Sequence, residues 1–172
     1  MRHFAQIQAK EIFYITNKIS KYKTMNLLSG KKDNASVETD GDRQGAESFF
    51  RGLRDRICAE FETIEAELVG TKHQDKPEGK FSRTVWHHSD LDGSPGGGGE
   101  ISVMKGRVFE KVGVNISTVF GTFSPQFRAN IPGAEENNGR FWATGISLVA
   151  HMCSPKVPAV HMNLRMIQTA KS

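Results

Sequence analysis

Polar side chains that could do chemistry recur in two segments near the C-terminal end, residues 141–151 and 160–166, around a proline-containing loop at 152–159. Both segments are predicted strands, in which alternate side chains share a face. If the strands pair antiparallel, one face carries two imidazoles, an amide, a hydroxyl and a guanidinium, from Ser147, His151, His161, Asn163 and Arg165. A guanidinium binds a carboxylate through two parallel hydrogen bonds, and neutral histidine moves protons near pH 7. The pattern indicates a site for an anionic ligand.

A structural interpretation of the same face stays open. An antiparallel sheet with one face in water normally carries polar residues on that face. The alternating residues of the second segment, Val160, Met162, Leu164 and Met166, are apolar and are predicted to bury themselves. Periodicity therefore predicts which residues share a face, and leaves both a ligand site and a solvated face as explanations.

The elements that must position these strands come earlier in the chain. A helix is predicted from an N-cap at Asp42 to a C-terminal cap at Gly70. Its apolar residues recur mostly at spacings of three and four, at Phe49, Phe50, Leu53, Ile57, Phe61, Ile64 and Leu68. We expect this stripe to pack on a sheet, and a helix that binds a partner is the alternative.

The middle of the chain reads as further strands, at residues 81–87, 101–104, 107–111 and 112–121, with a turn at Gly106. The segment 89–99 is predicted to be a loop ending in four glycines. It is not a phosphate-binding P-loop, because Gly99 is followed by Glu100 and not by lysine and serine or threonine. Residues 122–140 are predicted to be irregular. A helix followed by consecutive strands predicts an α+β fold with an antiparallel sheet.

Composition limits the classes of protein and partner. A chain of 172 residues predicts one domain, and no apolar run approaches the roughly 20 residues of a membrane-spanning helix. The net charge of +4 comes from scattered basic residues, so nucleic acid is not an expected partner. Cys58 and Cys153 are far apart and form no CxxC pair, which predicts free thiols in a reducing compartment.

The N-terminal region has a different character. Residues 1–28 are basic, with Glu11 as the single acid, and residues 29–42 are polar. We interpret residues 1–42 as a flexible extension and linker, and residues 43–172 as part of one domain. The basic segment is either a transit peptide or an extended start, with Met25 as a second plausible start. The predicted location is cytoplasmic, or mitochondrial if the segment is a transit peptide.

Two long blocks carry a resemblance to a known family. They read GGGGEISVMKGRVFEKVGVNISTVFG and then FWATGISLVAHMCSPKVPAVHMNLRM, preceded by the helix FFRGLRDRICAEFETIE. The sequence from about residue 44 to 169 closely resembles the oxygen-dependent coproporphyrinogen III oxidases of the bacterial type. Several long matched blocks in the same order make the resemblance highly specific.

The resemblance implies an enzyme of heme biosynthesis. Two propionate side chains of coproporphyrinogen III become vinyl groups, giving protoporphyrinogen IX, while oxygen accepts the electrons. It implies a large, flat antiparallel sheet between helices and a homodimer. It implies no organic cofactor and O2 as co-substrate. It also implies histidines as candidate ligands of a divalent metal ion.

Carried over residue by residue, the resemblance makes His161 the proton donor. It makes His151 and His161 two of four candidate metal ligands, although two imidazoles are fewer than a metal site usually has. It assigns substrate binding to Ser147, Asn163, Leu164 and Arg165. His87 and His88 are adjacent, would point to opposite faces of a strand, and are not expected to form a site.

The sequence departs from the family pattern in three ways. Phe120 stands where a histidine is common, and Met152, Cys153 and Ser154 replace a proline-rich start of the loop. The family continues past this point with a WFGGG-like segment, further histidines, an aspartate and the main dimer contacts. We therefore expect this chain alone to be inactive, or active only with a further half, and prone to aggregate. The alternative is a non-catalytic porphyrinogen- or heme-binding remnant.

Overall fold

The computed structural model describes residues 35–70 and 75–169, and the chain divides into two compact units, residues 1–40 and 41–172. The predicted basic segment and the second start at Met25 lie outside the described residues. The second unit contains a long helix and an antiparallel sheet, which confirms the predicted α+β class. None of the helices within the two described ranges has the length and hydropathy needed to cross a bilayer.

The long helix α2 runs from Ala35 to Ala66, so the predicted N-cap at Asp42 is wrong and residues 35–42 are helical instead of linker. No proline interrupts this stretch, and Gly41 lowers helix propensity without stopping the helix. Gly70 has a positive φ of 68°, but it lies beyond the end of the helix and does not cap it directly. The predicted apolar stripe is real, and its buried members are Phe50, Leu53 and Phe61.

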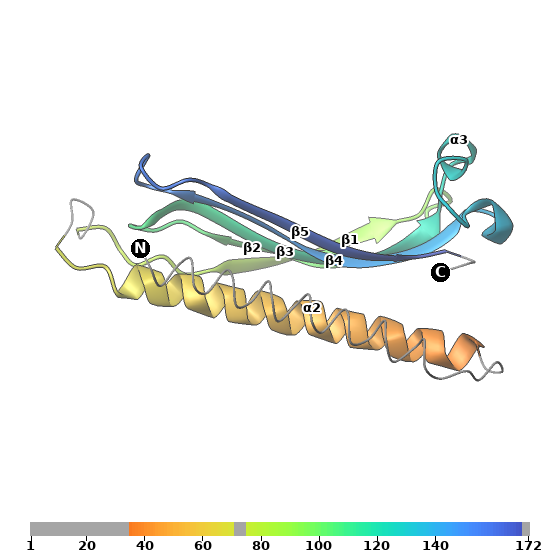
Figure 1. Ribbon diagram of the computed structural model, residues 1–172, viewed down its shortest axis with the longest axis horizontal. Helices are drawn as coiled ribbons and strands as arrows, with labels where there is room; N and C mark the ends of the chain where they lie inside the picture. Colours follow the sequence, from red (N-terminus) through yellow and green to blue (C-terminus); the bar gives the residue numbers. More distant parts are fainter. Residues whose placement is uncertain (1–34, 71–74, 170–172) are drawn as a thin grey trace. The chain divides into compact units, whose positions relative to one another are not determined.

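Five strands form one sheet in sequence order, and every neighbouring pair is antiparallel (Figure 1). The strands are β1 (Ser82–Ser89), β2 (Pro95–Met104), β3 (Phe109–Thr122), β4 (Arg140–Met152) and β5 (Val160–Gln168). The two C-terminal strands and the loop between them lie where the alternation of polar and apolar residues predicts them. Because each strand pairs with the next along the chain, short connections suffice to build the sheet.

Two details of the middle strands differ from prediction. The glycine run belongs to β2 and is not the predicted loop. At Gly98 a Cβ would collide with the carbonyl oxygen of Trp86 on β1. Glycine is thus needed for close backbone approach and not for a turn. Residues 109–122 form one continuous strand instead of two, after a turn in which the Gly106 N–H donates to the Phe109 carbonyl oxygen at 2.9 Å.

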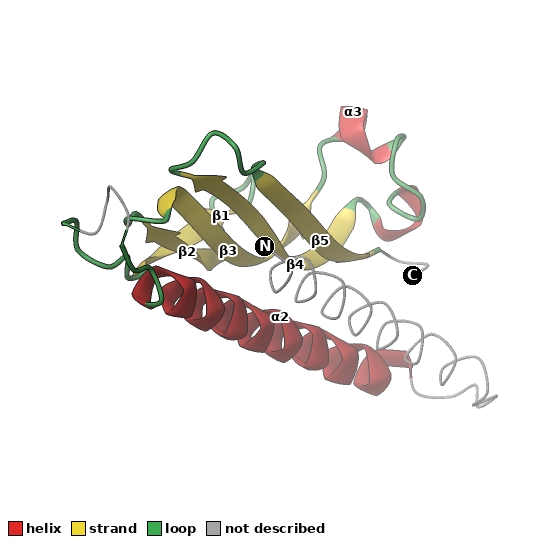
Figure 2. Ribbon diagram, turned by 60° about the vertical axis from the view of Figure 1, so that its left-hand side comes forward, coloured by secondary structure: helices red, strands yellow, loops and turns green. Residues whose placement is uncertain are grey.

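Helix α2, over residues 41–66, covers one face of the sheet (Figures 1 and 2). The Phe61 and Phe109 rings meet edge to face with centroids 4.9 Å apart, and the Arg43 guanidinium lies 5.4 Å from the centre of the Trp142 ring. The buried side chains of the central strands share this face, namely Val112, Val114, Ile116, Trp142, Ile146, Leu148 and Ala150. The predicted packing of the helix on a sheet is confirmed.

Two buried charged residues stand among the apolar residues of α2. Arg54 forms ion pairs with Asp55, at 2.8 Å, and with Glu100 of β2. Glu65 is fully buried, and its carboxylate accepts backbone N–H groups from the segment before β1 and from the β2–β3 turn. Buried charges persist only when they are paired or hydrogen-bonded. These contacts therefore fix the helix to the sheet at two places, at Glu100 of β2 and at the β2–β3 turn.

The chain between β3 and β4 is not wholly irregular as predicted. It contains the short helix α3 (Pro125–Arg128) and a 3-10 turn at Glu135–Asn137. The Phe123 and Phe141 rings stack with centroids 4.1 Å apart, which joins this segment to the start of β4.

Candidate functional site

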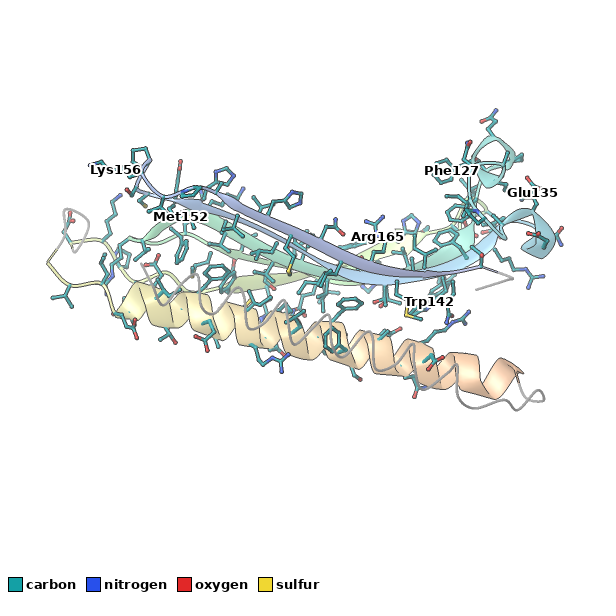
Figure 3. The ribbon with its side chains drawn as sticks, viewed as in Figure 1. Phe127, Glu135, Trp142, Met152, Lys156 and Arg165 are labelled. Atoms are coloured by element: carbon teal, nitrogen blue, oxygen red, sulfur yellow. The ribbon has the colours of Figure 1, made fainter. Side chains whose placement is uncertain are left out.

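The strand register brings the predicted site residues of β4 and β5 onto the face opposite α2. Ser147 pairs with Asn163, and Gly145 pairs with Arg165. Figure 3 shows Trp142 on the side of the sheet toward α2 and Arg165 on the other side. The predicted parity of Ser147, His151, His161, Asn163 and Arg165 is therefore correct. We call this surface the open face.

Two adjacent rows of residues cross the open face from β1 to β5. The first row runs Thr84, Ile101, Asn115, Ser147, Asn163, and the second runs Trp86, Gly99, Ser117, Gly145, Arg165. The second row contains two glycines in its interior, so its middle is low. The Trp86 ring lies over Gly99, with two ring carbons 2.9 Å from the position that a Cβ would take. The rows thus form a trough with an indole at one end and a guanidinium at the other.

A groove of about 320 Å³ follows these rows. Its side-chain lining from the open face is Trp86, Ile101, Asn115, Ser117, Ser147, Asn163 and Arg165. An apolar wall with a few placed polar groups is typical of sites for small organic ligands. Within the two described ranges, no carboxylate forms an ion pair with Arg165, so its guanidinium is free to bind an anion.

The histidines lie on the open face but outside the lining of this groove. His161 pairs with Val149 and is two residues from Asn163, roughly 7 Å along the strand. His151 pairs with Lys111 of β3 and is a diagonal neighbour of His161. Both side chains are exposed. His161 is thus near the groove, and His151 is further from it.

The described part of the chain offers no group of three or more histidine, cysteine or acidic side chains that could hold a metal ion. Zinc and similar ions usually take three or four protein ligands. His151 and His161 alone do not supply that set. The assignment of these two residues as metal ligands stays a prediction.

The other predicted site residues fall in different places. Leu164 pairs with Ile146 and shares its helix-facing parity, so the backbone of Leu164, and not its side chain, borders the groove. Phe120 pairs with Trp142 and lies on the same helix-facing parity, 41% exposed. His87 pairs with Gly98 and borders a separate hollow of about 260 Å³ on the α2 side.

Sequence reasoning missed the part of the groove that β1, β2 and β3 contribute. Its members are Trp86, Ile101, Asn115 and Ser117. The alternation along β3 does put Asn115 and Ser117 on one face. The sequence carries no signal that this face of β3 lies on the same side of the sheet as the site residues of β4. Strand order and register depend on contacts between distant segments.

Comparison with known proteins supports the resemblance. Residues 45–172 match the family model of coproporphyrinogen III oxidase. The chain is 60% identical over 130 residues to the oxygen-dependent coproporphyrinogen-III oxidase of Rickettsia bellii (strain RML369-C), covering 76% of this chain and 44% of that protein. It is 59% identical over 127 residues to the protein of the same name from Rickettsia felis, covering 74% and 43%.

The chain therefore spans less than half of the length of the relatives it matches. The match begins near the start of the compact unit and includes all five strands of the sheet and every residue that lines the groove. Since the family model covers about three quarters of the sequence, the chain belongs to the coproporphyrinogen III oxidase family.

Proposed function

We propose that this chain carries part of the substrate site of an oxygen-dependent coproporphyrinogen III oxidase. In that reaction a propionate arm, CH2–CH2–COOH, reacts with O2 to give a vinyl group, carbon dioxide and hydrogen peroxide. Two electrons pass to dioxygen as the carbon–carbon bond to the carboxyl group breaks. The protein must hold carboxylates around a large apolar ring and supply protons to reduced oxygen.

One observation carries the proposal, namely that Ser147, Asn163 and Arg165 share one groove on the open face. A guanidinium forms a two-bonded pair with a carboxylate, and a hydroxyl and an amide N–H donate further hydrogen bonds. Trp86 and Ile101 offer apolar surface for the ring. In this proposal Arg165 binds a propionate, and Ser147, Asn163 and the backbone of Leu164 orient it.

His161 is the proposed proton donor. Its imidazole is exposed on the open face beside Asn163, and peroxide needs two protons to leave as hydrogen peroxide. Histidine exchanges protons near neutral pH, which suits this task. A divalent metal does not fit the two imidazoles of the described residues as a complete site, so no step is assigned to it.

The test is turnover of coproporphyrinogen III under air by the 172-residue chain, read as protoporphyrin fluorescence after oxidation. If the parent turns the substrate over, His161→Ala should lower that turnover at least 100-fold, the lower range for loss of a positioned acid or base. His88→Ala is the matched control, because His88 is an exposed histidine on β1, at the opposite edge of the sheet from β5. Turnover that is unaffected by His161→Ala would refute the assigned role.

The same assay separates catalysis from binding alone. A chain that covers less than half of its relatives could retain the substrate groove without the whole catalytic apparatus. Binding of coproporphyrinogen III without turnover would favour the second candidate function, a non-catalytic porphyrinogen-binding protein. Absence of both binding and turnover would contradict the proposed function of this chain.

We also propose a cytoplasmic location, and the homodimer that the resemblance implies for the full-length family. The edge strands β1 and β5 each pair on one side within the described sheet, so backbone groups remain available for a further strand or a second copy. Sedimentation velocity at several concentrations tests this proposal. A species of monomer mass at every concentration would contradict it.

A further inference from the structure

The amide of Asn115 has an unusual environment on the open face. It lies near the middle of β3, between Ile101 on β2 and Ser147 on β4. Its Oδ1 atom is buried, and no hydrogen-bond donor reaches it from the described residues. This is the single buried side-chain oxygen or nitrogen without a partner in that part of the chain. The amide also lines the groove.

A buried carbonyl oxygen without a donor is unfavourable, because folding removes its bonds to water and supplies none in return. Buried polar groups in native proteins nearly always have a partner, and the exceptions call for an explanation. Ser147, the neighbour opposite Asn115, makes no hydrogen bond to it. A ligand in the groove that brings a donor to Oδ1 would satisfy it.

The chemistry of the proposed substrate limits what that donor can be. At neutral pH the propionates of coproporphyrinogen III are carboxylates, which accept hydrogen bonds and would be repelled by Oδ1. The remaining periphery is alkyl. The four pyrrole N–H groups at the centre of the reduced macrocycle are its donors. A buried acceptor in this groove therefore matches the centre of the ring and not its rim.

We propose that Asn115 is a substrate-binding residue whose Oδ1 accepts a hydrogen bond from a pyrrole N–H of the porphyrinogen. This inference rests on the proposed function. It divides the groove by chemistry, with Asn115 for the ring centre and Arg165 for a carboxylate at the rim. Because oxidation to the porphyrin leaves two N–H groups in place of four, this contact favours the reduced substrate.

The spacing on the sheet is compatible with this division. Asn115 and Arg165 lie two strands apart and in adjacent rows, roughly 10 Å across the sheet and 7 Å along it. That span is of the size of the path from the centre of a tetrapyrrole to the end of a propionate arm. On the other side, Trp86 covers Gly99 and provides an aromatic surface for the ring.

The test compares two ligands with the same four carboxylates. Coproporphyrinogen III, kept reduced under nitrogen, has four N–H donors, whereas zinc coproporphyrin III has none. Binding of each to the 172-residue chain is measured by isothermal titration calorimetry. The key variant is Asn115→Leu, which keeps the approximate size and removes the acceptor. Asn130→Leu is the matched control, since Asn130 lies in the exposed segment after α3.

We expect Asn115→Leu to bind coproporphyrinogen III about tenfold more weakly, equivalent to about 1.4 kcal/mol, and zinc coproporphyrin III less than twofold more weakly. Arg165→Met should weaken both ligands alike, because both carry carboxylates. Asn115→Asp retains an acceptor and should keep the ratio of the two affinities closer to the parent than Asn115→Leu does. The thermal midpoint of Asn115→Leu should equal or exceed that of the parent, because no native hydrogen bond is lost.

The possible outcomes separate the two proposals. If the parent binds neither ligand, the proposed function fails for this chain, and the assignment of Asn115 fails with it. If the parent binds both but Asn115→Leu changes neither affinity, or changes both by the same factor, the assignment of Asn115 is wrong while the proposed function stands. Selective loss of affinity for the reduced ligand supports the assignment.

Discussion

Replacement of Glu65 by glutamine should strongly destabilise the fold, although the two side chains have nearly the same shape. Oε2 accepts the N–H groups of Gly79 at 3.1 Å and Arg107 at 2.9 Å. Oε1 accepts those of Val108 at 3.0 Å and Phe109 at 2.9 Å. Glutamine has one acceptor oxygen and an NH2 group that only donates. It can serve one of these pairs and must face the other with a donor.

The magnitude follows from two backbone N–H groups that lose their acceptor inside the protein. A buried donor left without a partner costs about 1–3 kcal/mol, so Glu65→Gln should lower the free energy of unfolding by about 2–6 kcal/mol. A domain of this size is stable by only about 5–15 kcal/mol. The variant should therefore be marginally folded, or largely unfolded at 37 °C.

Urea denaturation followed by far-ultraviolet circular dichroism measures this change. The control is Glu67→Gln, because Glu67 is an exposed glutamate just two residues after Glu65. The control should lie within about 0.5 kcal/mol of the parent. A Glu65→Gln variant as stable as the control would refute the reasoning. It would mean that the carboxylate is not the group that holds the β2–β3 turn to α2.

The same carboxylate makes stability depend on pH. Burial opposes the ionisation of Glu65, but the N–H groups of Phe109, Arg107, Gly79 and Val108 outweigh it and hold its pKa below the ordinary value of 4.5. A lowered pKa in the folded state means that the stabilisation is complete above pH 4.5 and is lost as the pH falls through the folded value. Glu65→Gln should lack this part of the acid dependence.

Two further predictions concern the sheet and the thiols. A Cβ at Gly145 would lie 2.5 Å from the Leu164 carbonyl oxygen, so Gly145→Ala should lower the free energy of unfolding in urea by about 1–3 kcal/mol. Gly113→Ala should lower it less, because the nearest atom to a Cβ at Gly113 is 3.8 Å away. Equal losses of stability would contradict the steric argument. Burial raises the pKa of the Cys58 thiol to about 11 and also raises that of the less buried Cys153. A disulfide reagent at pH 8 should therefore label Cys153 faster than Cys58, and faster labelling of Cys58 would contradict its burial.

The C-terminal hairpin could be predicted well because its information is local. Alternation along each strand determines which side chains share a face, and the loop between the strands makes them neighbours. The pairing of Ser147 with Asn163, and of Gly145 with Arg165, follows once the two strands are joined in register. Three of the seven side chains that line the candidate groove, Ser147, Asn163 and Arg165, were therefore accessible from the sequence.

The polar residues buried under α2 could not be predicted in the same way. Glu65 and Arg54 lie among apolar residues of a helix, where a charged side chain normally indicates the solvent side. They are buried because N–H groups and carboxylates from other segments reach them, such as Glu100 of β2. Such partners are distant in sequence and leave no periodic signal.

The sequence by itself determined the family, the α+β class and the parity of the residues on β4 and β5, because matched blocks and two-residue alternation are properties of short segments. Only the tertiary structure decided that the glycine run is a strand and that Trp86 and Asn115 meet Arg165 across one groove. The order and register of β1 to β5 depend on which backbones can approach one another and on what α2 buries. Those are contacts between segments far apart in the chain, so only the folded chain brings these residues together in one candidate site.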